Sequence, residues 1–341
     1  MSTVFEPTPE PLKKKDTPQV EQKKKLLFVV HRYAPFPGGS ENYVRDMAET
    51  AYLRGHTVAV FAGEHRGPLN GVFVTSDPEI LKHTWDLIIV HGGDVGVQNY
   101  VLQQANKLGG PVLYLLILPS HSPVCVGALH SAKYLGCSTL ADWRHVASYN
   151  ATGKAVRVRH GINLQQSIGD AGFREKYGIK TKYMFMSAGG FWPNKGFDEL
   201  VDTFNRAGRT DTTLLLTGYD NRFGIMPKES EFVRPMILEQ RETMLSALRE
   251  SDLYVLNSTS EGFGLVLLES MLNGTPWIAR NIAGAETMRE FGKTYSTQEE
   301  LEKYLREFAG ESQTLIKSGQ QYVIAAHQIT HTIDDILRAI K

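Results

Sequence analysis

The sequence has few of the features that mark secreted, metal-stapled or membrane-spanning proteins. It contains two cysteines, Cys125 and Cys137, without a CxxC pair or a cysteine and histidine cluster, so neither a disulfide framework nor a structural zinc site is expected. No run reaches the roughly 18 to 20 apolar residues of a membrane span, and no apolar stretch opens the chain as a signal peptide would. We therefore expect a soluble, cytoplasmic protein.

The chain also lacks an excess of charge of either sign. Lys+Arg and Asp+Glu both number 37, which gives no sign of an extended surface for nucleic acid or membrane. The local exception is residues 1–24, where prolines lie among charged residues and lysines cluster at 13–15 and 23–25. This composition cannot bury enough apolar surface to order itself and predicts a flexible tail. Its lysines could touch anionic lipid or nucleic acid, but a solubilising leader is the favoured interpretation.

What the chain does have is a regular alternation of short apolar runs and helix-length amphipathic segments. At 341 residues it is too long for one ordinary core and suits two domains. Strands are expected at 26–30, 57–61, 86–90 and 112–118, and again at 183–188, 213–218 and 253–257. Branched apolar runs separated by helices favour buried parallel strands. The order predicts an α/β protein with two Rossmann-like, doubly wound domains facing across a cleft.

The expected domain limits follow from the same alternation. We place the N-terminal domain at 25–165 and the C-terminal domain at 166–320, with the final helix-like stretch, 321–341, packing back on the first domain. Ligands of open α/β sheets bind outside the carboxyl ends of the strands. The loops that follow the strands are therefore the candidate site.

The most informative segment is NSTSEGFGLVLLESMLNGTP, residues 257–276. Gly262 and Gly264 would let the backbone approach a ligand, and the free N–H groups at the start of the next helix would bind an anion. Glu261 and Glu269 would be separated by roughly 12 Å along a helix, too far for one acid/base pair. Such carboxylates suit two sets of hydroxyls, as of a sugar and a ribose. The alternative is that Glu261 complements the helix dipole and Glu269 is a surface residue.

EGFGLVLLE, from Glu261 to Glu269, resembles the E-x7-E motif of retaining glycosyltransferases of the GT-B fold, especially glycosyltransferase family 4. The resemblance implies that Glu261 contacts the transferred sugar and that Glu269 binds the donor ribose. The intervening backbone amides that would meet the sugar and the phosphates belong to Gly262, Phe263, Gly264 and Leu265.

Three further segments resemble the family in its usual order, so the resemblance covers nearly all of the chain from residue 25 onward. YAPFPGGSENYV is similar to the glycine-rich first loop, where Gly38 and Gly39 would place backbone N–H groups against the donor diphosphate. RHGINL is similar to the N-G-V-D segment that closes the first domain, with His160 replacing the usual Asn in a structural role. SAGGFWPNKGFDEL is similar to the G-R-x-x-x-x-K-G segment, with Lys195 as the cation for the phosphates.

The chain departs from the family at Gly190, where an arginine is common. Half of the expected diphosphate clamp is therefore missing. Either another cation compensates, with Arg32 and Arg222 as candidates, or the donor relies more on helix N-termini and backbone donors.

Two histidines follow predicted strands. His91 stands where the family carries its own HxH-like strand end, and we expect it to face the cleft and position acceptor or sugar; the alternative is a loop histidine bonded to backbone. His121 lies about four residues later than the family's second active-site histidine, which leaves its role open. The nucleotide base should meet the loops after Gly218 and around 233–238 through the backbone, so uridine, guanosine and adenosine donors all stay open.

The implied reaction moves a sugar from a nucleoside-diphosphate sugar to an acceptor hydroxyl with retention, in glycan or glycoconjugate synthesis. Lys195, the Gly39 loop and the amides of 262–264 would stabilise the leaving diphosphate, and with no obvious DxD site neither a metal nor another cofactor is expected. The acceptor, whether a glycan, a lipid-linked sugar or another hydroxyl, leaves no pattern. The alternatives are a nucleotide-sugar epimerase or hydrolase on the same fold and a transferase that glycosylates modified DNA bases. A glycoside hydrolase is disfavoured, because its carboxylates should lie within roughly 5 to 10 Å.

Overall fold

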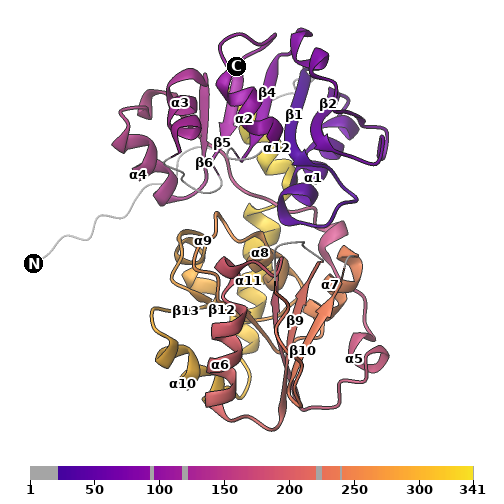
Figure 1. The fold of residues 1–341 in the computed structure, drawn as a ribbon, viewed down its shortest axis with the longest axis vertical. Helices are drawn as coiled ribbons and strands as arrows, with labels where there is room; N and C mark the ends of the chain where they lie inside the picture. Colours follow the sequence, from indigo (N-terminus) through magenta and orange to yellow (C-terminus); the bar gives the residue numbers. More distant parts are fainter. Residues whose placement is uncertain (1–21, 93–95, 117–121, 220–224, 239, 341) are drawn as a thin grey trace, which may run out of the picture.

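The computed structural model describes residues 22–92, 96–116, 122–219, 225–238 and 240–340, and these form two α/β lobes stacked one above the other (Figure 1). The first lobe is built on a seven-stranded sheet of order β3-β2-β1-β4-β5-β6-β7, and the second on a six-stranded sheet of order β10-β9-β8-β11-β12-β13. Both sheets are parallel in every pairing of their strands. The predicted α/β class with two Rossmann-like sheets is confirmed.

The first lobe alternates strand and helix as the apolar runs predict. Its strands are β1 (Lys25–Arg32), β2 (Thr57–Glu64), β3 (Phe73–Thr75), β4 (Leu87–His91), β5 (Val112–Leu115), β6 (Tyr134–Cys137) and β7 (Ala155–Arg157). Its helices are α1 (Gly39–Leu53), α2 (Gly96–Gln103), α3 (Pro123–Ser131) and α4 (Leu140–Ser148), with short 3-10 turns η1 (Pro78–Lys82) and η2 (Thr152–Lys154). All of β4 is buried, because helices cover both faces of the sheet. The strand order reverses between β1 and β4, where such sheets bind ligands.

The second lobe repeats this plan. Its strands are β8 (Tyr183–Ala188), β9 (Thr212–Gly218), β10 (Val233–Ile237), β11 (Leu253–Leu256), β12 (Trp277–Arg280) and β13 (Lys293–Tyr295). Its helices are α5 (Phe173–Lys176), α6 (Phe197–Ala207), α7 (Arg241–Arg249), α8 (Leu265–Leu272), α9 (Ala283–Thr287), α10 (Gln298–Glu307) and α11 (Gln313–Ala326), with η3 (Gln165–Ser167), η4 (Pro193–Lys195) and η5 (Arg289–Phe291). Here the order reverses between β8 and β11, so the loops after these strands occupy the corresponding position.

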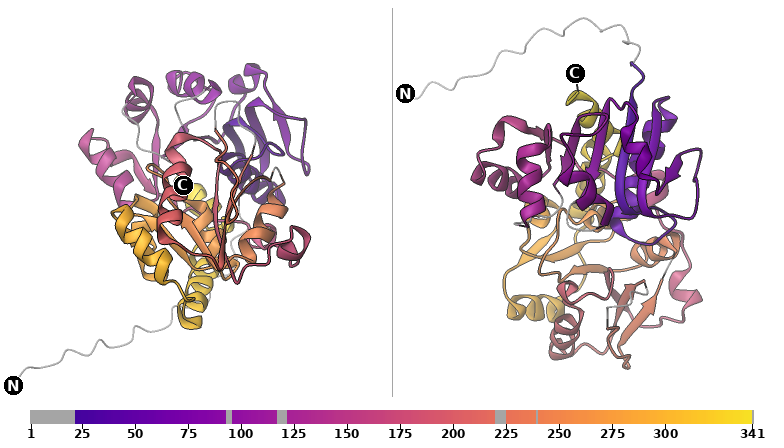
Figure 2. Two further views of the ribbon diagram at one scale, coloured as in Figure 1. Left: turned by 60° about the horizontal axis from the view of Figure 1, so that its bottom comes forward. Right: turned by 45° about the horizontal axis from the view of Figure 1, so that its top comes forward.

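The C-terminal stretch is two helices rather than the single one expected over 321–341. The first, α11, packs on α8 of the second lobe, and α12 (Ile329–Arg338) crosses to pack on α1. Figure 1 and the right view of Figure 2 show this yellow helix in the first lobe. At the crossing, the amide of Ile162 donates to the carbonyl of His327 and that of Ile329 to Ile162, both at 2.9 Å. The two connections between the lobes are thus paired with each other.

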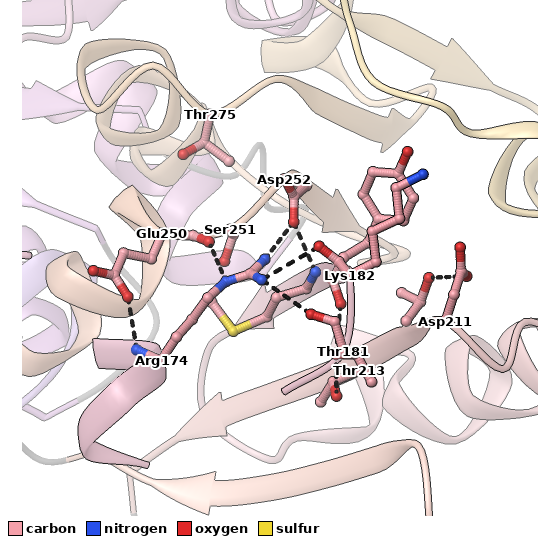
Figure 3. Close-up of polar contacts among 12 residues, drawn as sticks. Arg174, Thr181, Lys182, Asp211, Thr213, Glu250, Ser251, Asp252 and Thr275 are labelled. Atoms are coloured by element: carbon pink, nitrogen blue, oxygen red, sulfur yellow. Dashed lines mark hydrogen bonds and ion pairs between the residues drawn. The ribbon is translucent and has the colours of Figure 1, made fainter. Parts of the chain in front are cut away.

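A polar network centred on Arg174 ties α5 to the rest of the second lobe (Figure 3). Its guanidinium donates to the carbonyls of Glu250 at 3.0 Å and Thr181 at 3.2 Å and forms an ion pair with Asp252. The same Asp252 carboxylate accepts the amide of Met184 at 2.8 Å. Because charged hydrogen bonds to buried backbone are among the stronger ones, this network fixes the end of α7 against the start of β8.

Candidate functional site

A cavity of about 390 Å³ lies between the two lobes. Its volume is that of a pocket for a small molecule. The first lobe contributes the loop after β1, part of α1 and the end of β4, and the second contributes the loops after β8, β9 and β11. The candidate residues that line it are Gly38, Gly39, His91, Lys195, Gly218, Glu261, Gly262, Phe263, Gly264, Leu265 and Glu269. The structure therefore brings these candidates to one place, while their individual roles stay predictions.

Two helices begin at this cavity, one from each lobe. Helix α1 starts after Gly38 and α8 starts after Gly264, which has a left-handed φ of 76° that disfavours other residues. Neither helix has a side-chain hydrogen bond at its N-cap, and the glycine at the start of each helix lines the cavity, so first-turn N–H groups remain for a ligand. Two helix N-termini with glycine caps make a binding site for an anion such as a diphosphate.

Lys195 and Glu261 form an ion pair in the wall of the second lobe. Lys195 ends the η4 turn and Glu261 follows β11, and both are less than a quarter exposed. The Ser258 hydroxyl donates to the same carboxylate oxygen, Oε1, at 2.9 Å. The fold thus places a cation from the loop after β8 beside a carboxylate that precedes α8.

Glu269 lies deeper, in the middle of α8, and is bound by an arginine. Arg241, the first residue of α7, donates to Glu269 Oε1 at 2.7 Å and to the Ser167 hydroxyl at 2.9 Å. Its other amino group lies 3.3 Å from Asp46 Oδ2 of α1, in the first lobe. Because Glu269 is buried, the interpretation of it as a surface residue is wrong. Arg241 and Asp46 were not predicted from the sequence.

Two histidines of the first lobe, His91 and His160, are buried, and burial favours their neutral form. His91 ends β4 with its ring 5.0 Å from that of Tyr43, and burial holds the pKa of His91 well below its usual value. Its Nδ1 has no hydrogen-bond partner among the residues that the structure describes. Burial lowers the pKa of His160 to about 3, and its Nδ1 lies 2.8 Å from the Tyr43 hydroxyl. The His160 ring also packs 4.9 Å from Phe263, so it links α1 to the glycine turn.

The cations considered as substitutes for the arginine missing at Gly190 are placed differently. Arg32 donates to Glu41 at 2.7 Å and stacks 5.6 Å from the Phe36 ring, and it is not among the residues that line the cavity. Arg222 lies outside the described residues, as does His121. A further cavity residue, Thr217 at the end of β9, was not singled out from the sequence.

The described ranges show neither a candidate membrane span nor a cluster of metal-ligating side chains. No helix there combines the length and the apolar character needed to cross a bilayer. The same residues hold no group of three or more His, Cys, Asp or Glu side chains arranged for a metal ion.

Known proteins resemble the chain in sequence over part of its length and in fold over nearly all of it. Residues 182–310 match the family described as Glycosyl transferases group 1. The N-acetyl-alpha-D-glucosaminyl L-malate synthase of Bacillus anthracis is 28% identical over 127 residues, which cover 36% of this chain. The match spans only 33% of that relative's length.

Solved structures extend the likeness to almost the whole chain. Sucrose-phosphate synthase from Thermosynechococcus elongatus superposes with a TM-score of 0.73 at 17% identity, over 93% of this chain and 98% of that one. The Anabaena protein HepE, in complex with UDP and glucose, gives 0.73 at 18% identity, over 93% and 99%. At such identities the likeness shows the fold, which is GT-B.

Proposed function

Since the chain carries a group 1 glycosyl transferase segment on a GT-B fold, we propose that it moves a sugar from a nucleoside-diphosphate sugar to an acceptor hydroxyl. The observation that carries this proposal is the interlobe cavity, which is lined by the starts of α1 and α8 and by Lys195. These groups present positive charge from both lobes to one anionic ligand. A diphosphate flanked by a ribose and a sugar matches the order of the groups along α8.

Departure of the diphosphate is the step that the cavity would assist. As the bond between the anomeric carbon and the phosphate oxygen breaks, negative charge grows on the leaving group. The Lys195 ammonium has three donors and can serve Glu261 and a phosphate oxygen together. The amides at Gly39 and around Gly264 would add stabilisation that needs no rearrangement. This electrostatic support is why we include metal independence in the proposal, and transfer should persist in EDTA.

Glu261 and His91 would hold the sugar. Glu261, held in place by the ion pair with Lys195, would accept a sugar hydroxyl and support the positive charge that develops at the anomeric carbon. His91 is neutral and its Nδ1 is unpartnered among the described residues, so it can share a hydrogen bond with a sugar or acceptor hydroxyl. Departure and attack on the same face of the sugar would give retention, which NMR of the product's anomeric proton would establish.

A binding screen followed by one substitution tests the proposal. UDP, ADP, GDP and their glucose conjugates should include at least one that raises the melting temperature, because binding to the native state alone stabilises it. Lys195→Met should weaken diphosphate binding while the bare nucleoside binds as before. No stabilisation by any of these compounds would overturn the proposal.

The second arm measures turnover of the donor that the screen identifies. Glu261→Ala should lower transfer by at least about 10²- to 10³-fold, the scale for loss of one transition-state contact, with an unchanged circular dichroism spectrum. Retained turnover would remove Glu261 from the assignment. Incubating the donor without acceptor also separates the alternatives, since an epimerase converts it fully and a transferase leaves it nearly intact.

A further inference from the structure

Arg241 is a charged side chain in the cavity wall whose contacts reach both lobes. Its side chain is 8% exposed, and its guanidinium is held by Glu269 and Ser167 of the second lobe and by Asp46 of the first. Asp46 is itself buried and also accepts from Arg45 at 2.8 Å. Arg45, Asp46, Arg241 and Glu269 therefore form a continuous network of ion pairs that connects the two lobes at the cavity.

The position of Glu269 depends on this network. Its Oε1 accepts from Arg241 at 2.7 Å, and a buried carboxylate without such a partner would gain a proton or turn toward water. Burial works against the charge of Arg241, but Glu269 and Asp46 outweigh it and raise the pKa of Arg241. Arg241 thus occupies Glu269 Oε1 and orients the carboxylate, whose remaining acceptor sites can receive the hydroxyls of a ribose.

We propose that Arg241 is a positioning residue that fixes Glu269 for the ribose of the donor, and that the lobe-to-lobe contact with Asp46 sets its place. The inference rests on the proposed function, because it takes the donor to be a nucleoside diphosphate. Arg241 acts through Glu269, whereas Lys195 and the helix N-termini bind the phosphates. Ribose recognition is in this way coupled to the approach of the two lobes.

Discrimination between ribose and 2′-deoxyribose reports on this coupling. Isothermal titration gives the ratio of Kd for 2′-deoxy-UDP to Kd for UDP, or for the matching adenosine or guanosine pair, using the base that binds the wild type. One charge-assisted hydrogen bond corresponds to a ratio of about tenfold or more. Glu269→Gln should bring this ratio near one. Arg241→Met should do the same although it leaves the carboxylate in place, and Arg241→Lys should restore part of it.

Matched controls separate positioning from general stability. Arg174→Met removes an arginine network that lies outside the cavity lining, so it should keep the wild-type ratio. Asp46→Asn keeps the shape but weakens the contact between the lobes, and should lower the ratio by less than Arg241→Met does. If Arg241→Met does not fold, Arg241→Lys decides by the same ratio.

Each result bears on a different claim. A wild-type ratio in Arg241→Met, or in Arg241→Lys if that variant must decide, with only the melting temperature lowered, would overturn the positioning role. A wild-type ratio in Asp46→Asn would overturn the dependence on the first lobe. Failure of every nucleoside diphosphate to bind the wild type would instead refute the proposed function itself.

Discussion

Two arginines organise polar networks in this protein, and the two differ in what surrounds them. Arg174 makes its contacts inside the second lobe, and each of its side-chain nitrogens donates to a carbonyl or a carboxylate (Figure 3). Arg241 bridges the lobes, lines the cavity, and keeps an Nε that has no partner within the described part of the chain. A network in which every donor has an acceptor needs no ligand to complete it. A buried donor without a partner needs an explanation, and in a cavity wall a bound ligand can provide it.

Other cavity residues share this property. His91 Nδ1 and Thr217 Oγ1 are also buried and unpartnered among the described residues, and both side chains belong to the cavity wall. The side chains that contact Arg174 include none of these unpartnered atoms. The unpartnered atoms in the cavity wall are therefore available to a ligand, whereas the Arg174 network is completed by folding alone.

Removing Arg174 should cause the greatest loss of stability, because its network serves folding and not the ligand. Arg174→Met leaves Asp252 and two backbone carbonyls without their donor, and should lower the free energy of unfolding by about 3 kcal/mol, the lower end for a broken buried pair because the site is partly exposed. Urea unfolding measures this loss. Donor affinity measured well below the melting temperature should not change. A loss under about 1 kcal/mol would show that the network contributes little.

The next largest effect should come from Gly284 in α9, which touches the glycine turn. A Cβ at Gly284 would lie 1.7 Å from the carbonyl oxygen of Phe263, so Gly284→Ala must displace that turn. Overpacking of this kind costs about 2 kcal/mol, and donor affinity should fall roughly tenfold. Gly127→Ala is the control, because a Cβ there meets nothing within 4 Å. Equal donor affinity in both variants would contradict the placement of the donor at the turn.

Lowering the pH should reduce the free energy of unfolding through His160, which packs against the glycine turn between the lobes. The pKa of His160 is about 3 in the folded protein and about 6.5 when unfolded, so between these values the unfolded state binds the extra proton. The contribution of His160 is fully present above pH 6.5 and is lost toward pH 3, by up to about 1.4 kcal/mol per pH unit. His160→Asn can still accept from the Tyr43 hydroxyl and should flatten this slope. Parallel stability curves from pH 7.5 to pH 4.5 for both proteins would contradict the assignment.

Much of the fold could be predicted because the signal is local. The run at 26–30 lies within β1 and the run at 86–90 matches β4 to within one residue, and helices bury the branched apolar residues of both strands on both faces. The short strands β3, β7 and β13 have three residues each, too few to show a period. The break between α11 and α12 also leaves no strong sequence signal, since the helix ends at His327 without proline or glycine.

The candidate site likewise has residues that local sequence reveals and contacts that only the folded chain creates. Glu261 and Glu269 belong to one turn and helix, so their spacing is visible in the sequence, and Lys195 follows a recognisable glycine-containing segment. The contact between Arg241 and Asp46 joins residues 195 positions apart, and only the assembled lobes bring them together. Thr217 could have been found, because it directly precedes Gly218, the last residue of β9, which was already a candidate.

A substitution at Thr217 should have a small effect, but it separates ligand binding from stability. Thr217 Oγ1 is buried beside the cavity without a partner in the described residues, so Thr217→Val removes no hydrogen bond from the protein itself. The free energy of unfolding should stay the same or rise slightly, while the donor binds about fivefold more weakly, or about 1 kcal/mol. Thr217→Ser keeps the hydroxyl and should retain the wild-type Kd. If calorimetry shows Val and Ser variants binding alike, the unpartnered hydroxyl is not a donor contact, and unsatisfied atoms no longer distinguish the cleft from the Arg174 network.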